Sequence, residues 1–206
     1  MARTILIDGR SGAGKTTFAQ LVGEETGFRV IHLDEFYPGW GGLVEGSEMV
    51  KDSVLRMDNP GYFRWDWVKN EPGQWVDVDP ESNLVIEGVG ALTESNVEAS
   101  RDRYRAAKCS GEPVNRENGC LTVWTEVPGA IRKERALARD PGFVDFWDMW
   151  ARQEDEFMRV ANRRNAIEKA NMKLELSGAS PQVDKETVQS ALRTVSYTHL
   201  TLPTNR

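Results

Sequence analysis

One glycine-rich segment near the start of the chain combines residue types that could bind phosphate. Residues 9–16 read Gly-Arg-Ser-Gly-Ala-Gly-Lys-Thr and match the pattern G-x-x-x-x-G-K-[ST] at every fixed position. Glycines let a loop turn successive backbone N–H groups toward one anion. We expect Lys15 to reach the β- and γ-phosphates of a nucleotide and the hydroxyl of Thr16 to bind Mg²⁺. The predicted phosphate-binding residues are Gly9, Ser11, Gly12, Ala13, Gly14, Lys15, Thr16 and Thr17.

The segments on either side of this loop are those that a phosphate-binding loop requires. The apolar run at residues 4–7 predicts a buried strand, and residues 17–22 predict a helix with Phe18, Leu21 and Val22 on one face. A helix that starts beside the loop adds unpaired N–H groups and the positive end of its dipole. The alternative is a glycine-rich turn with a surface lysine, and the strand–loop–helix context disfavours it.

Two acidic residues follow predicted strands and are candidates for chemistry on the phosphate. Asp34 follows the strand expected at 28–33, and Glu87 ends the strand expected at 83–88. Ligands of a parallel sheet bind at the carboxyl ends of its strands, so both acids could meet Lys15. We expect Asp34 to act as general base for an acceptor hydroxyl and Glu87 to orient Mg²⁺ or its waters. The alternative for Asp34 is an aspartate that forms a turn or caps a helix. The alternative for Glu87 is an acid at a strand end that is solvated or caps a helix.

A run of arginines supplies positive charge later in the chain. Arg132, Arg135 and Arg139 have the spacing of one helix face, in a helix expected at 128–139. Phosphoryl transfer needs cations for the charge of its transition state, so we expect Arg135 and Arg139 to contact the transferring group. A solvated basic face is the alternative.

Aromatic and charged residues in an irregular segment could form the pocket of a phosphate acceptor. Packing under a mobile loop is an equally good explanation for them. The candidate substrate-binding residues are Tyr37, Trp40, Arg64, Trp65 and Asp66.

Apolar runs alternate with segments of helical periodicity along the chain. This alternation predicts an α/β fold in which helices cover both faces of a parallel sheet. We expect a single domain over residues 1–195. Further strands are expected at 121–125 and 172–176, and further helices at 64–69, 93–107 and 143–167.

Composition excludes several classes of function. The chain has 206 residues, a formal net charge of -6 and a pI of about 5.1, which argues against binding of a nucleic-acid polymer. We find no apolar run long enough to cross a bilayer, and we expect a cytoplasmic protein. The two cysteines, Cys109 and Cys120, are therefore expected to be reduced, and a disulfide between them is the alternative.

The order of these motifs resembles the uridine kinase-like group of P-loop kinases. The resemblance covers roughly residues 1–165 and rests on Gly9–Thr16, Asp34-Glu35-Phe36-Tyr37, Ile86-Glu87-Gly88 and Arg135…Arg139-Asp140. It implies a three-layer fold with a five-stranded parallel sheet and a helical lid. It also implies ATP and Mg²⁺, with Asp34 as catalytic acid/base, Glu87 near Mg²⁺, and Arg135 and Arg139 as lid arginines. Residues 40–78 depart from the uridine-binding segments of that group.

The last residues stand apart from the rest of the sequence. Residues 196–206 resemble a translated sequencing-adapter or vector read-through, and an ordinary frayed tail is the alternative. Neither interpretation assigns a function to these residues.

Three functions are consistent with a phosphate-binding loop. A regulatory GTPase would need an Asn-Lys-x-Asp segment that reads guanine, and the sequence has none. We expect an ATP-dependent kinase that transfers the γ-phosphoryl group to a small acceptor such as a nucleoside. The alternative is a non-catalytic ATP-binding protein of the same fold.

Overall fold

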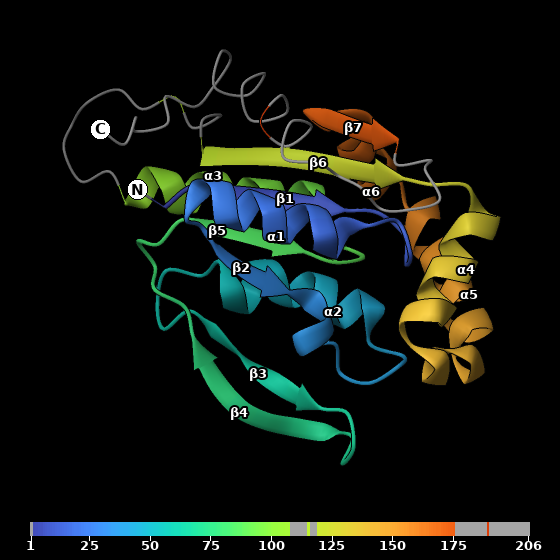
Figure 1. Ribbon diagram of the computed structural model, residues 1–206. Helices are drawn as coiled ribbons and strands as arrows, with labels where there is room; N and C mark the ends of the chain where they lie inside the picture. Colours follow the sequence, from blue (N-terminus) through green and yellow to red (C-terminus); the bar gives the residue numbers. More distant parts are fainter. Residues whose placement is uncertain (1, 108–114, 116–118, 176–188, 190–206) are drawn as a thin grey trace.

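The computed structural model describes residues 2–107, 115, 119–175 and 189 of the chain (Figure 1). Its centre is a five-stranded parallel sheet with the strand order β2-β5-β1-β6-β7. The strands are β1 (Thr4–Asp8), β2 (Arg29–His32), β5 (Leu84–Glu87), β6 (Cys120–Glu126) and β7 (Met172–Glu175). The five strands expected from the sequence are confirmed, as is the α/β class.

The register of the sheet brings the carboxyl ends of three strands together. Ile7 of β1 pairs with Glu87 of β5, and Glu87 pairs in turn with His32 of β2. The phosphate-loop segment that follows β1 therefore leaves the sheet beside Glu87 and His32. This edge of the sheet is where a parallel α/β protein binds its ligands.

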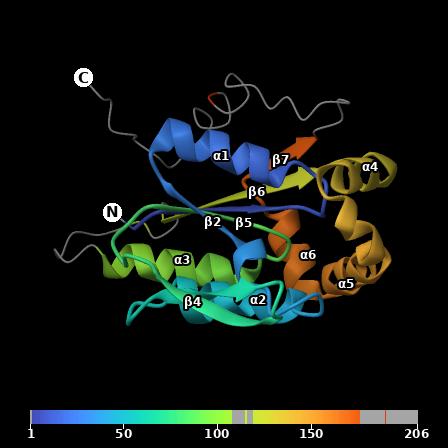
Figure 2. The same ribbon diagram turned by 60° about the horizontal axis from the view of Figure 1, so that its bottom comes forward.

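Helices cover both faces of the sheet and make three layers (Figure 2). Successive residues of β1 point to opposite faces. Ile5 and Ile7 belong to an apolar cluster with Phe18 of α1, whereas Leu6 belongs to a second cluster on the other face. The helices are α1 (Lys15–Thr26), α3 (Glu94–Ala106), α4 (Gly129–Arg139), α5 (Trp147–Arg159) and α6 (Ala161–Glu168).

The pair of helices α4 and α5 lies beyond the carboxyl ends of the strands (Figures 1 and 2). The sequence pattern predicts one long helix over 143–167, and the structure divides this segment. A 3-10 turn (Pro141–Asp145) precedes α5, and Val160 separates α5 from α6 with an extended backbone (φ -71°, ψ 129°). The Val160 carbonyl accepts the N–H groups of Arg163 and Arg164, so this β-branched residue precedes a new helix instead of continuing the old one.

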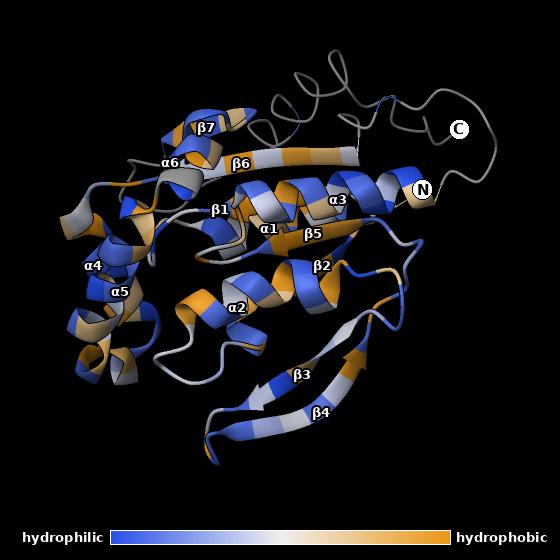
Figure 3. Ribbon diagram, turned by 180° about the vertical axis from the view of Figure 1, so that it is seen from behind, coloured by the Kyte–Doolittle hydropathy of each residue, from blue (hydrophilic) through white to orange (hydrophobic). Residues whose placement is uncertain are grey.

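The segment between β2 and β5 forms a separate hairpin that the sequence did not predict. The segment begins with α2 (Leu43–Met49) and a π-helical turn (Val50–Val54). The hairpin itself consists of the antiparallel strands β3 (Gly61–Asp66) and β4 (Glu71–Asp77). In Figure 3, β5 is hydrophobic over most of its length, whereas most of β3 and β4 is pale or blue.

The prediction of a short helix at 64–69 was wrong. Arg64 to Asp66 end β3, and the Asp66 carboxylate accepts the backbone N–H groups of Val68 and Lys69 to form the hairpin turn. Asn70 adopts a left-handed conformation (φ 55°) within the turn. Phe63 and Trp75 pack edge to face across the two strands. These cross-strand contacts favour a hairpin over local helix formation.

No helix among the described residues is both long enough and apolar enough to cross a membrane. The tail at 196–206, the end of the proposed domain at 195 and Cys109 lie outside the described residues. The expectations about them therefore stay predictions.

Candidate active site

The phosphate loop lies between β1 and α1, as its sequence pattern predicts. Lys15 is the first residue of α1, and its Nζ donates to the carbonyl of Arg10 at 3.3 Å within the loop. The loop borders a cavity of about 330 Å³. The other predicted site residues on the walls of this cavity are Ser11, Gly12, Gly14, Thr16, Thr17, Asp34, Glu87, Arg135 and Arg139.

Glu87 accepts hydrogen bonds from two different elements at the carboxyl end of β5. The Oγ1 of Thr16 donates to Glu87 Oε1 at 2.9 Å, and Nδ1 of His32 lies 2.6 Å from the same oxygen. Glu87 is only 2% exposed. Sequence reasoning missed His32, although its position at the end of β2 gives it the register partner Glu87.

The pKa values of this pair shift in the direction of an ion pair. Burial of Glu87 favours its neutral form, but the hydrogen bond from His32 and the charge of Lys15 outweigh burial and lower the pKa of Glu87. The hydrogen bond to Glu87 raises the pKa of His32 above its ordinary value, against the opposing effect of burial. Both shifts favour a carboxylate beside a protonated imidazole.

The donor set around Thr16 and Glu87 fits Mg²⁺. One hydroxyl oxygen and one buried carboxylate oxygen lie side by side next to the phosphate loop. Mg²⁺ keeps several waters and is commonly held by one or two protein oxygens together with substrate phosphates. No cluster of three or more His, Cys, Asp or Glu residues suited to a metal occurs in the described part of the chain.

Asp34 faces the same cavity from the turn that follows β2. Its side chain is accessible through the cavity but surrounded by protein, and this desolvation raises its pKa, as does the charge of Glu87. Lys15 and Arg139 act in the opposite direction. The indole N–H of Trp67 donates to the Asp34 carbonyl at 3.1 Å and fixes the backbone of this turn to the hairpin.

The three arginines of α4 have different surroundings. Arg135 and Arg139 line the cavity that contains Lys15 and Asp34. Arg132 instead donates from Nη1 to the carbonyl of Ser11 at 3.1 Å, so it binds the loop itself. The sequence pattern could not separate these roles because all three arginines share one spacing.

The structure resembles those of solved kinases. A sugar kinase from Janibacter sp. HTCC2649 matches with a TM-score of 0.51 and 18% identity, over 95% of each chain. The chain has the fold of the P-loop kinases. A gluconokinase from Sinorhizobium meliloti 1021 matches with a TM-score of 0.48 and 16% identity, over 96% of this chain and 94% of that chain. A shikimate kinase from Bacteroides thetaiotaomicron matches with a TM-score of 0.49 and 16% identity, over 95% and 97%.

At such identities the likeness concerns the fold alone. No model of a protein family matches the sequence. A search of curated proteins likewise finds no match.

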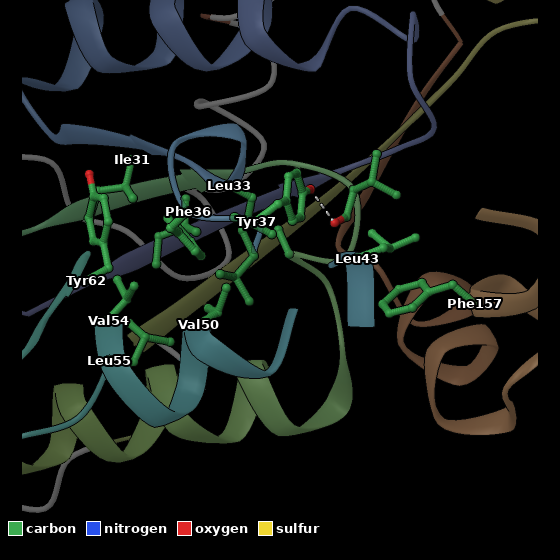
Figure 4. Close-up of a cluster of buried hydrophobic side chains, with 14 of the residues drawn as sticks. Ile31, Leu33, Phe36, Tyr37, Leu43, Val50, Val54, Leu55, Tyr62 and Phe157 are labelled. Atoms are coloured by element: carbon green, nitrogen blue, oxygen red, sulfur yellow. Dashed lines mark hydrogen bonds between the residues drawn. The ribbon is translucent and has the colours of Figure 1, made fainter. Parts of the chain in front are cut away.

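The five predicted acceptor residues are not among those that line the phosphate-loop cavity. Tyr37 is 1% exposed, and its hydroxyl donates to the carbonyl of Val89 at 2.7 Å within the apolar cluster (Figure 4). Trp40 stacks on Phe146 with ring centroids 4.2 Å apart and 5° between the planes. The structure thus places Tyr37 in the core and Trp40 in packing beneath the α4–α5 pair.

The remaining acceptor candidates belong to the hairpin. Arg64 forms an ion pair of 2.8 Å with Glu35, which also accepts the hydroxyl of Tyr62. Asp66 forms the hairpin turn, and the Trp65 side chain lies near Gly39. Their role in acceptor binding stays a prediction.

The phosphate loop also depends on a buried carboxylate that the sequence analysis did not single out. Asp8 accepts the N–H of Gly9 at 2.6 Å through one oxygen and those of Gly90 and Leu92 at 3.0 and 2.8 Å through the other. Burial raises the pKa of Asp8 to about 7. Asp8 therefore ties the start of the loop to the segment that follows β5.

Proposed function

We propose that this chain is an ATP-dependent phosphotransferase that acts on a small molecule. The observation that carries the proposal is the single cavity that contains Lys15, Thr16, Glu87 and Asp34 together with the arginines of α4. These are the groups that phosphoryl transfer requires: a phosphate cradle, oxygens for a metal, a base and cations. The fold shared with solved kinases supports it.

Each group has a distinct part in the proposed reaction. The loop amides and Lys15 hold the β- and γ-phosphates, and Thr16 and Glu87 hold Mg²⁺ directly or through water. The metal, when bound, neutralises charge on the phosphates. Asp34 accepts or orients the proton of the acceptor, and its raised pKa brings it closer to the pH at which a general base works best.

The acceptor that fits this cavity best carries a hydroxyl group. A hydroxyl must lose a proton as it attacks, so an aspartate in the phosphate-loop cavity would have a purpose, whereas a phosphate acceptor is already deprotonated. The solved proteins with similar folds include a sugar kinase and a gluconokinase. We propose a small alcohol of the nucleoside or sugar class, in a single cytoplasmic domain that needs no nucleic-acid polymer.

An acceptor screen tests this proposal. ADP release from Mg²⁺–ATP is measured against nucleosides, nucleotides, sugars and vitamin-like alcohols, with Lys15→Ala as the control. Acceptor-dependent release that disappears in the variant is the expected result. Nucleotide binding with no release for any acceptor would favour the alternative of a non-catalytic ATP-binding protein.

A further inference from the structure

Both polar groups of the Ser11 backbone are bound by the helices that cover the loop. The Ser11 N–H donates to Oε1 of Glu154 in α5 at 2.8 Å, and the Ser11 carbonyl accepts Nη1 of Arg132 in α4 at 3.1 Å. Glu154 Oε2 lies 3.6 Å from the same Nη1. Ser11, a single residue of the phosphate loop, therefore connects two helices that follow it by more than a hundred residues.

Glu154 is buried to an extent that needs an explanation. It is 1% exposed, and a buried carboxylate is unfavourable unless hydrogen bonds and an opposite charge compensate it. Its compensation comes from Ser11, from Arg132 and from the indole N–H of Trp150 at 3.1 Å. Two of these three partners belong to the phosphate loop or to α4, so the carboxylate serves the junction between α5 and the loop.

Packing fixes the position of Trp150, the third partner of Glu154. Trp150 contacts Tyr37 edge to face at 5.1 Å between ring centroids, and Trp40 at 6.3 Å. Gln153 donates to the carbonyl of Trp40 at 2.8 Å. The turn of α5 that contains Glu154 is therefore held by the core, and the carboxylate has a defined position.

Two further contacts bring the same elements together. Arg10 of the loop forms an ion pair of 2.6 Å with Asp155, the residue after Glu154. Gly12 has a left-handed backbone (φ +79°), and a Cβ at this position would collide with the carbonyl of Arg132. Helix α4 thus lies directly against the loop, with Arg135 and Arg139 on its next turns.

We propose that Glu154 is a positioning residue that fixes the phosphate loop to α4 and α5, so that the loop and the two cavity arginines adopt their places together. This inference rests on the proposed kinase function for its effect on rate. Its structural part, that Glu154 holds the phosphate loop in place, does not depend on the kinase function. A misplacement of about 1 Å in a reacting group can lower a rate by roughly a hundredfold.

The test compares Glu154→Ala and Glu154→Gln with Glu156→Gln, which makes the same charge change at an exposed residue of the same helix. Hydrogen–deuterium exchange of residues 9–14 reports the loop without any ligand. Titration with Mg²⁺–ADP reports nucleotide affinity, and transfer kinetics separate kcat from KM.

We expect Glu154→Ala to exchange faster at residues 9–14, to bind Mg²⁺–ADP more weakly and to lose kcat by roughly a hundredfold. Glu154→Gln keeps an oxygen for Ser11 and Trp150 but loses the ion pair with Arg132, so it should fall between Glu154→Ala and wild type. Glu156→Gln should match wild type.

Two outcomes would overturn the inference. Folded Glu154→Ala with unchanged exchange and ADP affinity would show that Glu154 only packs. Tighter ADP binding by this variant would show that the carboxylate competes with phosphate for the loop. If Glu154→Ala does not fold, Glu154→Gln and Trp150→Phe decide by the same measurements. A wild-type chain that binds nucleotide but shows no transfer to any acceptor would favour the non-catalytic alternative, while the exchange data would still decide the role of Glu154.

Discussion

The hydroxyl of Thr16 donates to Glu87 Oε1 at 2.9 Å, which joins the phosphate loop to the end of a neighbouring strand. The two residues are 71 positions apart in the sequence. Their proximity follows from the register of β1 and β5, whose ends lie at the same edge of the sheet.

Substitution of Glu87 should weaken the binding of Mg²⁺ during the reaction. Glu87→Gln keeps an acceptor for Thr16 and His32 but removes the charge that Mg²⁺ or its waters would face. We expect the Mg²⁺ concentration for half-maximal rate to rise roughly 10- to 100-fold. Glu24→Gln, at an exposed position of α1, is the control. An unchanged Mg²⁺ requirement in Glu87→Gln would remove this residue from the metal site.

The ion pair of His32 with Glu87 predicts a pH-dependent stability. The pKa of His32 is raised in the folded protein, so protonated His32 stabilises the fold. This stabilisation is complete below the ordinary pKa of about 6.5 and is lost as the pH rises through the raised pKa of the folded state. The free energy of unfolding is measured in urea with a chelator present, from about pH 5.5 to pH 8.5. Wild type should be more stable than His32→Gln at the low end of this range, and the difference should shrink as the pH rises. A constant difference between the two proteins across this range would contradict the assignment.

A methyl group at Gly12 should disturb the loop. Gly12→Ala meets both a positive φ and the backbone of Arg132, so we expect a loss of about 1–3 kcal/mol in unfolding free energy and weaker Mg²⁺–ADP binding. Gly41→Ala is the matched control because an added Cβ there has no atom within 4 Å. Equal behaviour of the two variants in thermal unfolding and ADP titration would argue against close contact between α4 and the loop.

Substitution of Tyr37 tests whether this residue belongs to the core or to a pocket for the acceptor. Tyr37→Phe leaves the buried carbonyl of Val89 without its hydroxyl donor, which should cost about 1–3 kcal/mol of stability. The KM for the acceptor should change little because the hydroxyl points into the core. A raised KM with unchanged stability would restore the substrate-binding role that the sequence predicts.

The sequence predicts those parts of the site that depend on local pattern. The phosphate loop is recognised because the residues that bind one anion are consecutive in the chain. Asp34 and Glu87 are found because parallel strands end at the same edge of a sheet. Each prediction needs only a short segment and one rule of topology.

The remaining parts depend on contacts between distant segments. The contact of Glu154 with Ser11 spans 143 positions, and no spacing in the sequence indicates it. Tyr37 and Trp40 could not be assigned to core or pocket until the position of α5 was known. The hairpin of β3 and β4 was missed because the residues that stabilise it, such as Phe63 and Trp75, lie on separate strands.

The most direct test of the account is transfer of the labelled γ-phosphoryl group from ATP to an acceptor by wild type, Lys15→Ala and Asp34→Asn. We predict labelled product with wild type and little or none with Lys15→Ala. Asp34→Asn should bind ATP as wild type does but form product roughly 100- to 10,000-fold more slowly. Normal transfer by Asp34→Asn would contradict its role as base, and labelled product from Lys15→Ala at the wild-type rate would contradict the proposed active site as a whole.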